Sequence, residues 1–393
     1  MSVPPGVAGR SLVVDARGLW LSGIGRYLRE VLAGVLADAR FARVTLLGHP
    51  GGIADFLATT DATVEARVVS FPHHFYSPGA ELHWAVLRAR GELRADAAFF
   101  PHYDVPLPGP LPPSVVTVHD LAHLRLPELF PAWKRALAGV VLGSAMRRAT
   151  RVVTISEFTR DDLLARHPAA RRKVEVIPQG VAGELAARAA SEGARRWADA
   201  LGPFVLCVGN QKPHKNLRAA VEVLAALRPE WPELRLVVAG KRYPGADDLA
   251  EHARALGVDG ALREVGAVDD DHLRALYGRA ECLLFPSRFE GFGLPVLEAM
   301  ACGLPVVASN RAAIPEAVGD AGLLVDPEDR AAMADSVRRL REPALRAEMV
   351  RRGRARAASL PWAATAARTA DLLCAVAGGA RGAARAPELR AAS

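Results

Sequence analysis

Two glutamates at a fixed separation are the residues of this sequence best suited to hold a ligand rich in hydroxyl groups. Seven residues separate Glu290 from Glu298, and two of them are Gly291 and Gly293. Glycines at these positions predict an open loop whose backbone N–H groups can face an anion. Pro295 then suits the first turn of a helix. Glu290 is therefore expected on the loop and Glu298 about one turn into the helix, where carboxylates facing one pocket can accept hydrogen bonds from a ribose or a sugar.

A second polar segment supplies the positive charge that a phosphate needs. It follows the apolar run 204–208, and its sequence from Gly209 to Asn216 is GNQKPHKN. Asn216 is a plausible N-cap for the helix expected after it. Lys212 and Lys215 place positive charge beside that helix start, and a lysine next to a helix N-terminus is a favourable diphosphate site. We prefer phosphate binding here; an ordinary solvated loop is the alternative.

Two shorter motifs follow expected strands in the first half of the chain. Gly23 and Gly25 come after the first strand and open a helix, where the backbone could approach an anion closely. A tight strand-to-helix turn is the alternative, and the pattern lacks the full GxGxxG of an NAD site. His119 and Asp120 directly follow the run 114–118, at a carboxyl end where a cleft would lie. The alternative there is that Asp120 caps a helix and His119 is only exposed.

Short apolar runs alternate with longer helical stretches and must position these motifs. Most runs are apolar throughout, which is typical of strands covered by helices on both faces. The expected strands are 11–15, 44–48, 66–70, 97–100, 115–119, 152–155 and 174–177 in the first half, and 204–208, 234–239, 262–265, 282–285, 305–308 and 323–325 in the second. This repetition predicts an α/β protein with two doubly wound, Rossmann-like sheets.

The length also favours two domains. The chain has 393 residues, more than the roughly 250–300 at which a single core stops growing. The change of sheet is expected near residues 180–202, where an Ala-rich polar stretch separates two apolar runs. The longest apolar stretch in the middle, 136–145, is far shorter than the roughly 20 residues that span a bilayer. With no secretory signal at the start, a soluble cytoplasmic protein, at most peripheral to the membrane, is expected.

The net charge of +7 is carried largely by arginine. Binding to nucleic acid is disfavoured because no nucleic-acid motif accompanies this charge. Solvated helix faces explain most of it, and attraction to anionic lipid or a phosphorylated carrier remains open. The four cysteines are scattered and are expected to be reduced and buried. The run Asp269-Asp270-Asp271 precedes a helix, so we interpret it as capping and not as a metal motif.

Taken together, these motifs resemble a known family. The run from Glu290 to Glu298 resembles the E-x7-E motif of the retaining GT-B glycosyltransferases of family four. Further runs resemble the same family: Gly23-Ile24-Gly25-Arg26-Tyr27, His119-Asp120, His214-Lys215-Asn216, Ser309-Asn310, Ile314-Pro315-Glu316, the stretch from Gly322 to Pro327, and Pro361-Trp362. The similarity covers roughly residues 10–375 and is most specific in the second domain. It implies the GT-B architecture, in which two Rossmann-like domains face a cleft.

The resemblance also implies a division of labour along the chain. Residues 1–190 would form the acceptor-binding domain and residues 191–360 the nucleotide-sugar-binding domain. Residues 361–377 would form a helix that crosses back and packs on the first domain. Residues 378–393, which are rich in Ala, Gly and Arg without an apolar period, are expected to be a flexible tail.

The resemblance assigns roles to individual residues. Lys215 would contact the diphosphate, with Asn210 or Lys212 beside it, and Glu298 would hold the donor ribose. Glu290 would approach the transferred sugar. The backbone of three consecutive residues would line the sugar and the phosphates: Phe292, Gly293 and Leu294. From the first domain, Gly23 would admit the diphosphate and His119 would contact the sugar near the reacting carbon.

The implied reaction is the retaining transfer of a hexose from a nucleotide-diphosphate sugar, without a metal or another cofactor. Lys215 and backbone dipoles would stabilise the departing diphosphate in place of a metal. The motifs look like those of mannosyl- and rhamnosyl-type bacterial enzymes of polysaccharide assembly, which favours GDP-mannose. The acceptor is expected to be a saccharide, a lipid-linked molecule or a natural product. The alternatives are a sugar-nucleotide epimerase or phosphorylase on the same fold, and a protein that binds nucleotide sugars without turnover.

Overall fold

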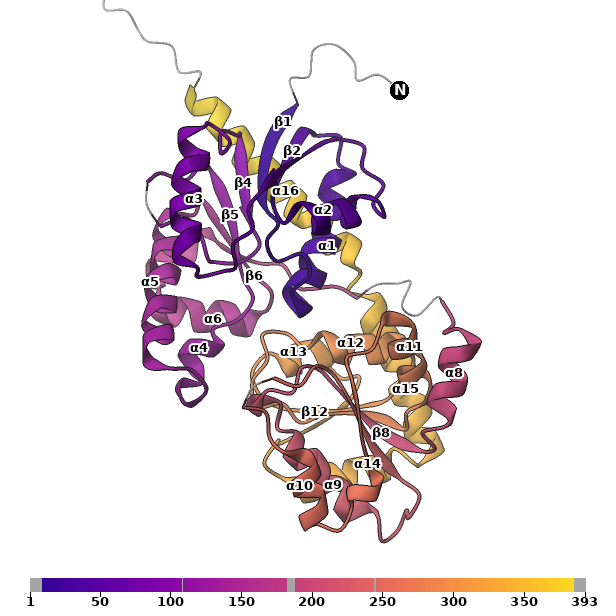
Figure 1. Ribbon diagram of the computed structural model, residues 1–393. Coiled ribbons are helices and arrows are strands. Elements are labelled where there is room, and N and C mark those ends of the chain that lie inside the picture. The colour runs from indigo at the N-terminus through magenta and orange to yellow at the C-terminus, as the bar shows by residue number, and fades with distance from the viewer. Residues whose placement is uncertain (1–8, 108, 182–187, 244, 385–393) are drawn as a thin grey trace, which may run out of the picture. The chain divides into compact units, whose positions relative to one another are not determined.

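The computed structural model describes the chain from residue 9 to residue 384, except for residues 108, 182–187 and 244 (Figure 1). The described residues form two compact units. The first unit consists of the chain up to Pro178 together with the segment from Trp362 onward, and the second runs from Gln179 to Pro361.

The first unit is built on a parallel sheet of seven strands. Their order across the sheet is β3-β2-β1-β4-β5-β6-β7. Every strand expected from the sequence is present: β1 (Arg10–Asp15), β2 (Phe41–Gly48), β3 (Glu65–Ser70), β4 (Ala97–Phe100), β5 (Ser114–Val118), β6 (Arg151–Thr154) and β7 (Val174–Val176). All the pairings are parallel. The order reverses between β1 and β4, so the topological switch point of this sheet lies between their carboxyl ends.

The second unit repeats this arrangement with six parallel strands, in the order β10-β9-β8-β11-β12-β13. The six expected strands are again all present: β8 (Phe204–Val208), β9 (Arg235–Ala239), β10 (Leu262–Gly266), β11 (Cys282–Phe285), β12 (Val306–Ser309) and β13 (Leu323–Val325). Here the order reverses between β8 and β11. The segment after β8 carries Lys215, and the segment after β11 carries Glu290. The sheet topology therefore brings the two strongest sequence motifs to one switch point.

Helices cover both faces of the first sheet (Figure 1). α3 and α5 pack through Trp84 and Leu142 into one core with the sheet, and α1 and α16 lie on the opposite face. The helices of this unit are α1 (Ser22–Leu36), α2 (Pro50–Leu57), α3 (Pro78–Ala89), α4 (Ala122–Arg125), α5 (Ala132–Arg148), α6 (Glu157–Arg166) and α16 (Trp362–Ala384), with 3₁₀ turns η1 (Pro127–Leu129) and η2 (Pro168–Lys173).

The second sheet is enclosed in the same way. α9 packs against α10 and α14 over one face, and Figure 1 shows α11, α12 and α13 over the other. The helices are α8 (Glu192–Asp199), α9 (Leu217–Leu227), α10 (Leu249–Ala255), α11 (Asp270–Arg279), α12 (Leu294–Ala301), α13 (Ile314–Val318), α14 (Arg330–Arg339) and α15 (Pro343–Ala358), with 3₁₀ turns η3 (Pro213–Lys215) and η4 (Asp259–Ala261).

The chain changes unit earlier than the boundary that we placed at residue 190. Val181 already belongs to the second unit, because its N–H donates to the Leu360 carbonyl (2.8 Å) and it pairs with Pro361. The composition change that suggested a later boundary marks the start of α8, not the end of the first sheet.

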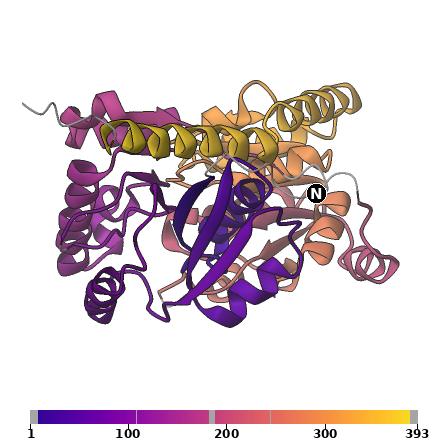
Figure 2. The ribbon, with the colours of Figure 1, turned by 90° about the horizontal axis from the view of Figure 1, so that it is seen from above.

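The helix α16 returns the end of the chain to the first unit (Figure 2). It packs along α1 so closely that a Cβ on Gly34 would lie 2.6 Å from Cβ of Ala366. The Thr365 hydroxyl donates to the Pro178 carbonyl at 2.8 Å. The prediction of a flexible tail from residue 378 is wrong for its first part, since α16 continues to Ala384. Alanine favours helix. The rest of the expected tail, 385–393, lies outside the described residues.

Two smaller expectations concern cysteines and membranes. The four cysteines are free. Cys207, Cys282 and Cys374 are buried, and Cys302 is half-buried. Among the described residues, no helix combines the length and the apolar character that crossing a bilayer requires.

Candidate functional site

Two loops of the second unit meet at the carboxyl edge of its sheet. The loop after β8 carries His214, and the loop after β11 carries Arg288. The Arg288 N–H donates to the His214 carbonyl at 2.8 Å, which joins the two loops by their backbones. The loop after β12 adds a third contact, because the Ala313 N–H donates to the Glu290 carbonyl at 3.4 Å. Segments far apart in sequence therefore form one continuous surface at the switch point.

Lys215 and Glu290 form an ion pair across this junction. The Lys215 Nζ donates to Glu290 Oε1 at 2.6 Å, and both side chains are largely buried. The same ammonium lies 5.5 Å from the centre of the Phe285 ring, the last residue of β11. A half-buried pair with limited access to solvent is electrostatically stronger than an exposed one. The sequence motifs for phosphate and for sugar are thus in direct contact.

The loop between the two glutamates leads into α12 as expected. Gly293 is the N-cap of α12 and adopts φ 113°, a left-handed conformation that disfavours any residue with a side chain. Pro295 occupies the first turn. Phe292 is buried and Leu294 is half-buried, so their side chains anchor the loop while its backbone forms the helix start. The first turn of α12 therefore presents the positive end of a helix beside Glu290.

Glu298 projects from α12 into a more enclosed position. It is 7% exposed, and its Oε2 accepts a hydrogen bond from the Tyr277 hydroxyl at 3.0 Å. Tyr277 comes from α11 and was not among the residues chosen from the sequence. In the sequence, Tyr277 looks like an ordinary apolar residue on the buried side of an amphipathic helix, and only its hydroxyl group distinguishes it. Its hydrogen bond fixes the orientation of the carboxylate that we expect to meet a ribose.

The other residues of the Lys215 loop have different surroundings. Lys212 is exposed and its Nζ lies 5.3 Å from the centre of the Tyr243 ring, while Asn210 is half-buried. Asn216 is the N-cap residue of α9, as expected, but its side chain makes no capping hydrogen bond to the helix. Its backbone is left-handed (φ 55°), and its amide donates to the Pro327 carbonyl at 2.8 Å instead of accepting from α9. Asn216 therefore ties the loop to the segment after β13.

In the first unit, the two glycines of the GIGRY motif have separate roles. A Cβ on Gly25 would lie 2.6 Å from the Leu19 carbonyl oxygen, so Gly25 is required by packing. Gly23 is exposed in the first turn of α1, and a Cβ there would meet no atom within 4 Å. The fold itself does not require glycine at position 23. Open space at a helix N-terminus is what a ligand phosphate would use.

His119 directly follows β5 and is buried, not exposed. Its Nε2 lies 2.8 Å from the Pro101 carbonyl, and the Tyr27 ring packs against it edge-on at 4.9 Å. Burial lowers the pKa of His119, so the neutral imidazole is favoured and donates from Nε2. Asp120 accepts the Ala122 N–H at 2.9 Å and so supports the start of α4. Whether His119 contacts a sugar stays a prediction.

The two glycines allow a matched test. We expect Gly25→Ala to lower the free energy of unfolding by about 1–3 kcal/mol, because the new methyl group meets the Leu19 carbonyl. Gly23→Ala should leave stability unchanged or raise it by up to about 1 kcal/mol, since alanine favours helix. The same change should weaken nucleotide binding. Denaturant unfolding and nucleotide titration measure both effects. Full nucleotide affinity in Gly23→Ala would contradict a role for Gly23 at the phosphates.

The triple aspartate acts as expected. Asp269 is the N-cap of α11 and accepts the His272 N–H at 2.8 Å, and Asp271 accepts the Ser191 N–H at 3.1 Å. Among the residues that the structure describes, no three His, Cys, Asp or Glu side chains are grouped closely enough to hold a metal ion.

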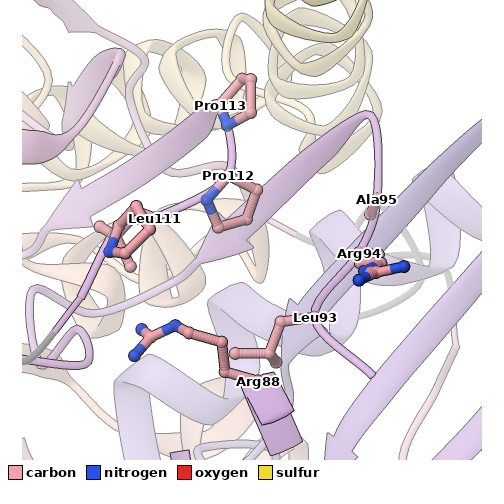
Figure 3. Close-up of a pocket in the computed structure, with 8 residues that line it drawn as sticks. Arg88, Leu93, Arg94, Ala95, Leu111, Pro112 and Pro113 are labelled. Atoms are coloured by element: carbon pink, nitrogen blue, oxygen red, sulfur yellow. The ribbon is translucent and has the colours of Figure 1, made fainter. Parts of the chain in front are cut away.

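A shallow pocket lies elsewhere on the first unit (Figure 3). It is lined by Arg88 from the last turn of α3, by Arg94 from the segment between α3 and β4, and by prolines that lead into β5. These segments are at the amino ends of the strands, opposite the edge that carries His119. None of the candidate site residues lines this pocket, so it is separate from the site.

Known proteins are similar to this chain in sequence and in fold. The "Glycosyltransferase Family 4" model matches residues 21–184, and the "Glycosyl transferases group 1" model matches residues 202–342. The O-antigen chain mannosyltransferase B of Escherichia coli is 29% identical, over 87% of this chain and 93% of that protein. The D-inositol 3-phosphate glycosyltransferase of Kineococcus radiotolerans is 30% identical, over 76% of this chain and 73% of that protein.

A solved structure agrees on the architecture. The crystal structure of Anabaena HepE in complex with UDP and glucose superposes with a TM-score of 0.72 at 20% identity, covering 93% of this chain and 99% of that one. Two Rossmann-like units, each matched by a glycosyltransferase family model, therefore define a protein of the GT-B class. The chain belongs to glycosyltransferase family 4 and is a transferase of glycosyl groups.

Proposed function

We propose that this enzyme transfers a hexose from a nucleotide-diphosphate sugar to a hydroxyl of a saccharide, lipid-linked or small-molecule acceptor. We further propose that it retains the anomeric configuration and needs no metal ion. The observation that carries the proposal is the Lys215–Glu290 pair at the switch point, 2.6 Å long and beside the start of α12. It combines a cation for a diphosphate with a carboxylate for a sugar.

The chemistry depends on the charge of the leaving group. As the glycosidic bond to phosphate breaks, the nucleoside diphosphate gains negative charge, which a fixed ammonium and backbone dipoles stabilise. Lys215 is held by Glu290, so its ammonium is positioned before the donor arrives. Glu298, fixed by Tyr277, is oriented to accept from the ribose hydroxyls. Because neither motif supplies an obvious covalent nucleophile, we favour attack on the face from which the leaving phosphate departs.

GDP-mannose is the donor we favour. The motifs around His119 and Lys215 resemble those of mannosyl-type enzymes, and a relative over most of the chain is described as a mannosyltransferase. The same relative acts on an O-antigen chain, which supports a saccharide acceptor in polysaccharide assembly. We place the reaction in the cytoplasm, close to the membrane, and expect no nucleic-acid partner.

A thermal-shift panel with UDP, GDP, dTDP and ADP tests the donor. At about one hundred times its Kd, the cognate diphosphate should add roughly 2.7 kcal/mol to the free energy of unfolding of the unit that binds it. We expect GDP to give the largest shift, in EDTA as well as in Mg²⁺. A larger thermal shift with another nucleotide would assign a different donor. A shift that appears only with a divalent ion would overturn metal independence.

Product analysis separates the alternatives. Incubation with GDP-mannose and an acceptor should yield GDP and a mannoside of retained configuration. Interconversion of the free nucleotide sugars would indicate an epimerase, and release of a sugar phosphate in the presence of inorganic phosphate would indicate a phosphorylase. Tight binding without turnover, across an acceptor panel, would indicate a protein that only binds nucleotide sugars.

A further inference from the structure

The pocket at the amino edge of the first sheet has the size and the lining of a small-molecule site. Its volume is about 470 Å³, within the range of roughly 300–1,000 Å³ that ligand pockets occupy. Of the described residues that line it, Arg88 and Arg94 carry the polar side chains. The other walls are apolar: Leu93, Ala95, Pro110, Leu111, Pro112 and Pro113. An apolar pocket with a few cationic groups suits a ligand that has an apolar body and an anionic group.

Arg88 brings into this pocket a charged group that lacks a partner. Its Nη2 is buried and has no hydrogen-bond partner in the part of the chain that the structure describes. The guanidinium lies against Gly109, where it fills the space that a side chain would need. Figure 3 shows it reaching toward the proline-rich segment that leads into β5. Buried guanidinium nitrogens are normally hydrogen-bonded, so a missing partner at a pocket wall indicates a place for an oxygen of a ligand.

The acidic residues of the segments that form the pocket are engaged elsewhere. Residues 78–96 and 109–113 contain three of them. Each has a partner outside the pocket: the Leu107 N–H for Glu81, the Arg67 guanidinium for Glu92 and the Ser11 N–H for Asp96. Among the described residues, no carboxylate pairs with Arg88 or Arg94. The positive charge of the pocket is therefore not neutralised by the chain.

A neighbouring guanidinium adds to this positive charge. The Arg148 side chain, from α5, donates to the carbonyls of Pro106, Leu107 and Gly109. Burial and the charge of Arg88 lower the pKa of Arg148. The two cations are therefore close enough to repel each other, and an anion bound at Arg88 would offset that repulsion.

We propose that this pocket binds a small organic phosphate. The planar guanidinium of Arg88 can donate to two phosphate oxygens, and Arg94, at the exposed rim, would add a second positive charge. The body of the ligand would lie against Leu93 and Pro112. A phosphate monoester carries about −1.5 to −2 charges at pH 7, so it matches several unneutralised cations better than a single carboxylate does.

The pocket is separate from the residues of the proposed reaction. It lies at the amino ends of β4 and β5, whereas His119 follows the carboxyl end of β5. β5 has 5 residues, so roughly 16 Å separate its two ends. Lys215 belongs to the second unit. A ligand in the pocket would join the end of α3 to the segments before β4 and β5, and so would act as an effector that stabilises the first unit. This role does not depend on the proposed function.

Calorimetric titration of the full chain with phenyl phosphate tests the site. The same titration in Lys215→Met, which lacks the ammonium of the proposed donor site, separates the pocket from that site. Both proteins should bind phenyl phosphate at the pocket at least tenfold more tightly than inorganic phosphate, because the ring buries apolar surface on leucine and proline. Benzoate should bind more weakly than phenyl phosphate, because it carries less charge.

A matched pair of arginines at the end of α3 identifies the contact. Arg88→Met keeps the apolar stem and should weaken phenyl phosphate binding about 10–100-fold, the range for hydrogen bonds to a charged group. Arg90 follows the same helix, is exposed and does not line the pocket. Arg90→Met should therefore change the affinity less than about twofold. Equal losses in the two variants would show a general attraction of charge and would overturn the proposal.

A second measurement does not depend on substitutions. A crystal structure of the unchanged chain with phenyl phosphate should place phosphate oxygens within hydrogen-bond distance of Arg88 Nη2. Binding that is lost in Lys215→Met but kept in Arg88→Met would assign the ligand to the donor site instead, and the proposal would be wrong. The absence of saturable binding up to about 10 mM, tenfold above a millimolar Kd, would also overturn it. The GDP-induced thermal shift of Arg88→Met reports separately on the fold and on the proposed donor site.

Discussion

Replacing Lys215 with methionine is expected to lower kcat by roughly 10²–10³, the loss seen when one fixed group that stabilises developing negative charge is removed. Methionine keeps most of the length of the side chain and removes the ammonium that lies 2.6 Å from Glu290. Nucleotide affinity should fall as well, because in our proposal the same charge also contacts the diphosphate in the ground state. Single-turnover transfer from GDP-mannose, together with titration of GDP, measures the two losses separately.

Lys241→Met provides the matched control. Lys241 is exposed on the loop after β9, and its Nζ lies 5.7 Å from the centre of the Tyr243 ring, a cation–π contact like that of Lys212. Its loss should change transfer less than about twofold and stability by less than about 0.5 kcal/mol. If Lys215→Met and Lys241→Met reduced kcat equally, general positive charge would explain the result, and the diphosphate role of Lys215 would be wrong.

Replacing Glu298 with glutamine is expected to raise the Kd of GDP by about 10–100-fold, which corresponds to roughly 1.5–3 kcal/mol for hydrogen bonds to a buried charge. The change keeps the shape of the side chain and removes the charge that accepts from Tyr277 and, in our proposal, from the ribose. Since the contact lies on the nucleoside, kcat at saturating donor should change much less than the affinity.

A double comparison identifies the contact. The unchanged enzyme should bind 2′-deoxy-GDP more weakly than GDP, and Glu298→Gln should bind the two about equally, because the lost interaction is the same one. Tyr277→Phe should give an intermediate loss. Glu348→Gln, which breaks exposed pairs with Arg351 and Arg352 on α15, should leave both affinities unchanged. A preference for GDP that survives in Glu298→Gln would show that another residue reads the ribose.

The sheets were predictable because their signal is local. A strand buried on both faces has to be apolar throughout, so runs such as 204–208 and 282–285 coincide with β8 and β11. Helix ends were less predictable. The sequence after residue 377 shows no helical periodicity of apolar residues. α16 nevertheless extends through it to Ala384, because alanine has the highest intrinsic helix propensity. Asn216 has the residue type of a cap, but its side chain has a better partner in the Pro327 carbonyl.

The residues of the site could be predicted from the sequence, but the contacts between them could be predicted only in part. Glu290, Glu298 and Lys215 were recognised from their motifs, but the contact of Lys215 with Glu290 depends on β8 and β11 being neighbours in the sheet. Strand order is a property of the whole fold, and no short segment encodes it. Tyr277 was missed for the same reason, since its hydroxyl becomes relevant only when α11 lies against α12.

The path of α16 has a consequence for how this protein is made. The first unit is discontinuous, because the helix that covers α1, β4 and β5 is encoded at the end of the chain. As a ribosome releases the chain, the whole second unit emerges before the residues that complete the first. The first unit, which begins the polypeptide, is therefore the last to be completed, and messages truncated before Trp362 encode a first unit that lacks this helix. In this protein, the integrity of the first unit depends on translation reaching the C-terminal segment.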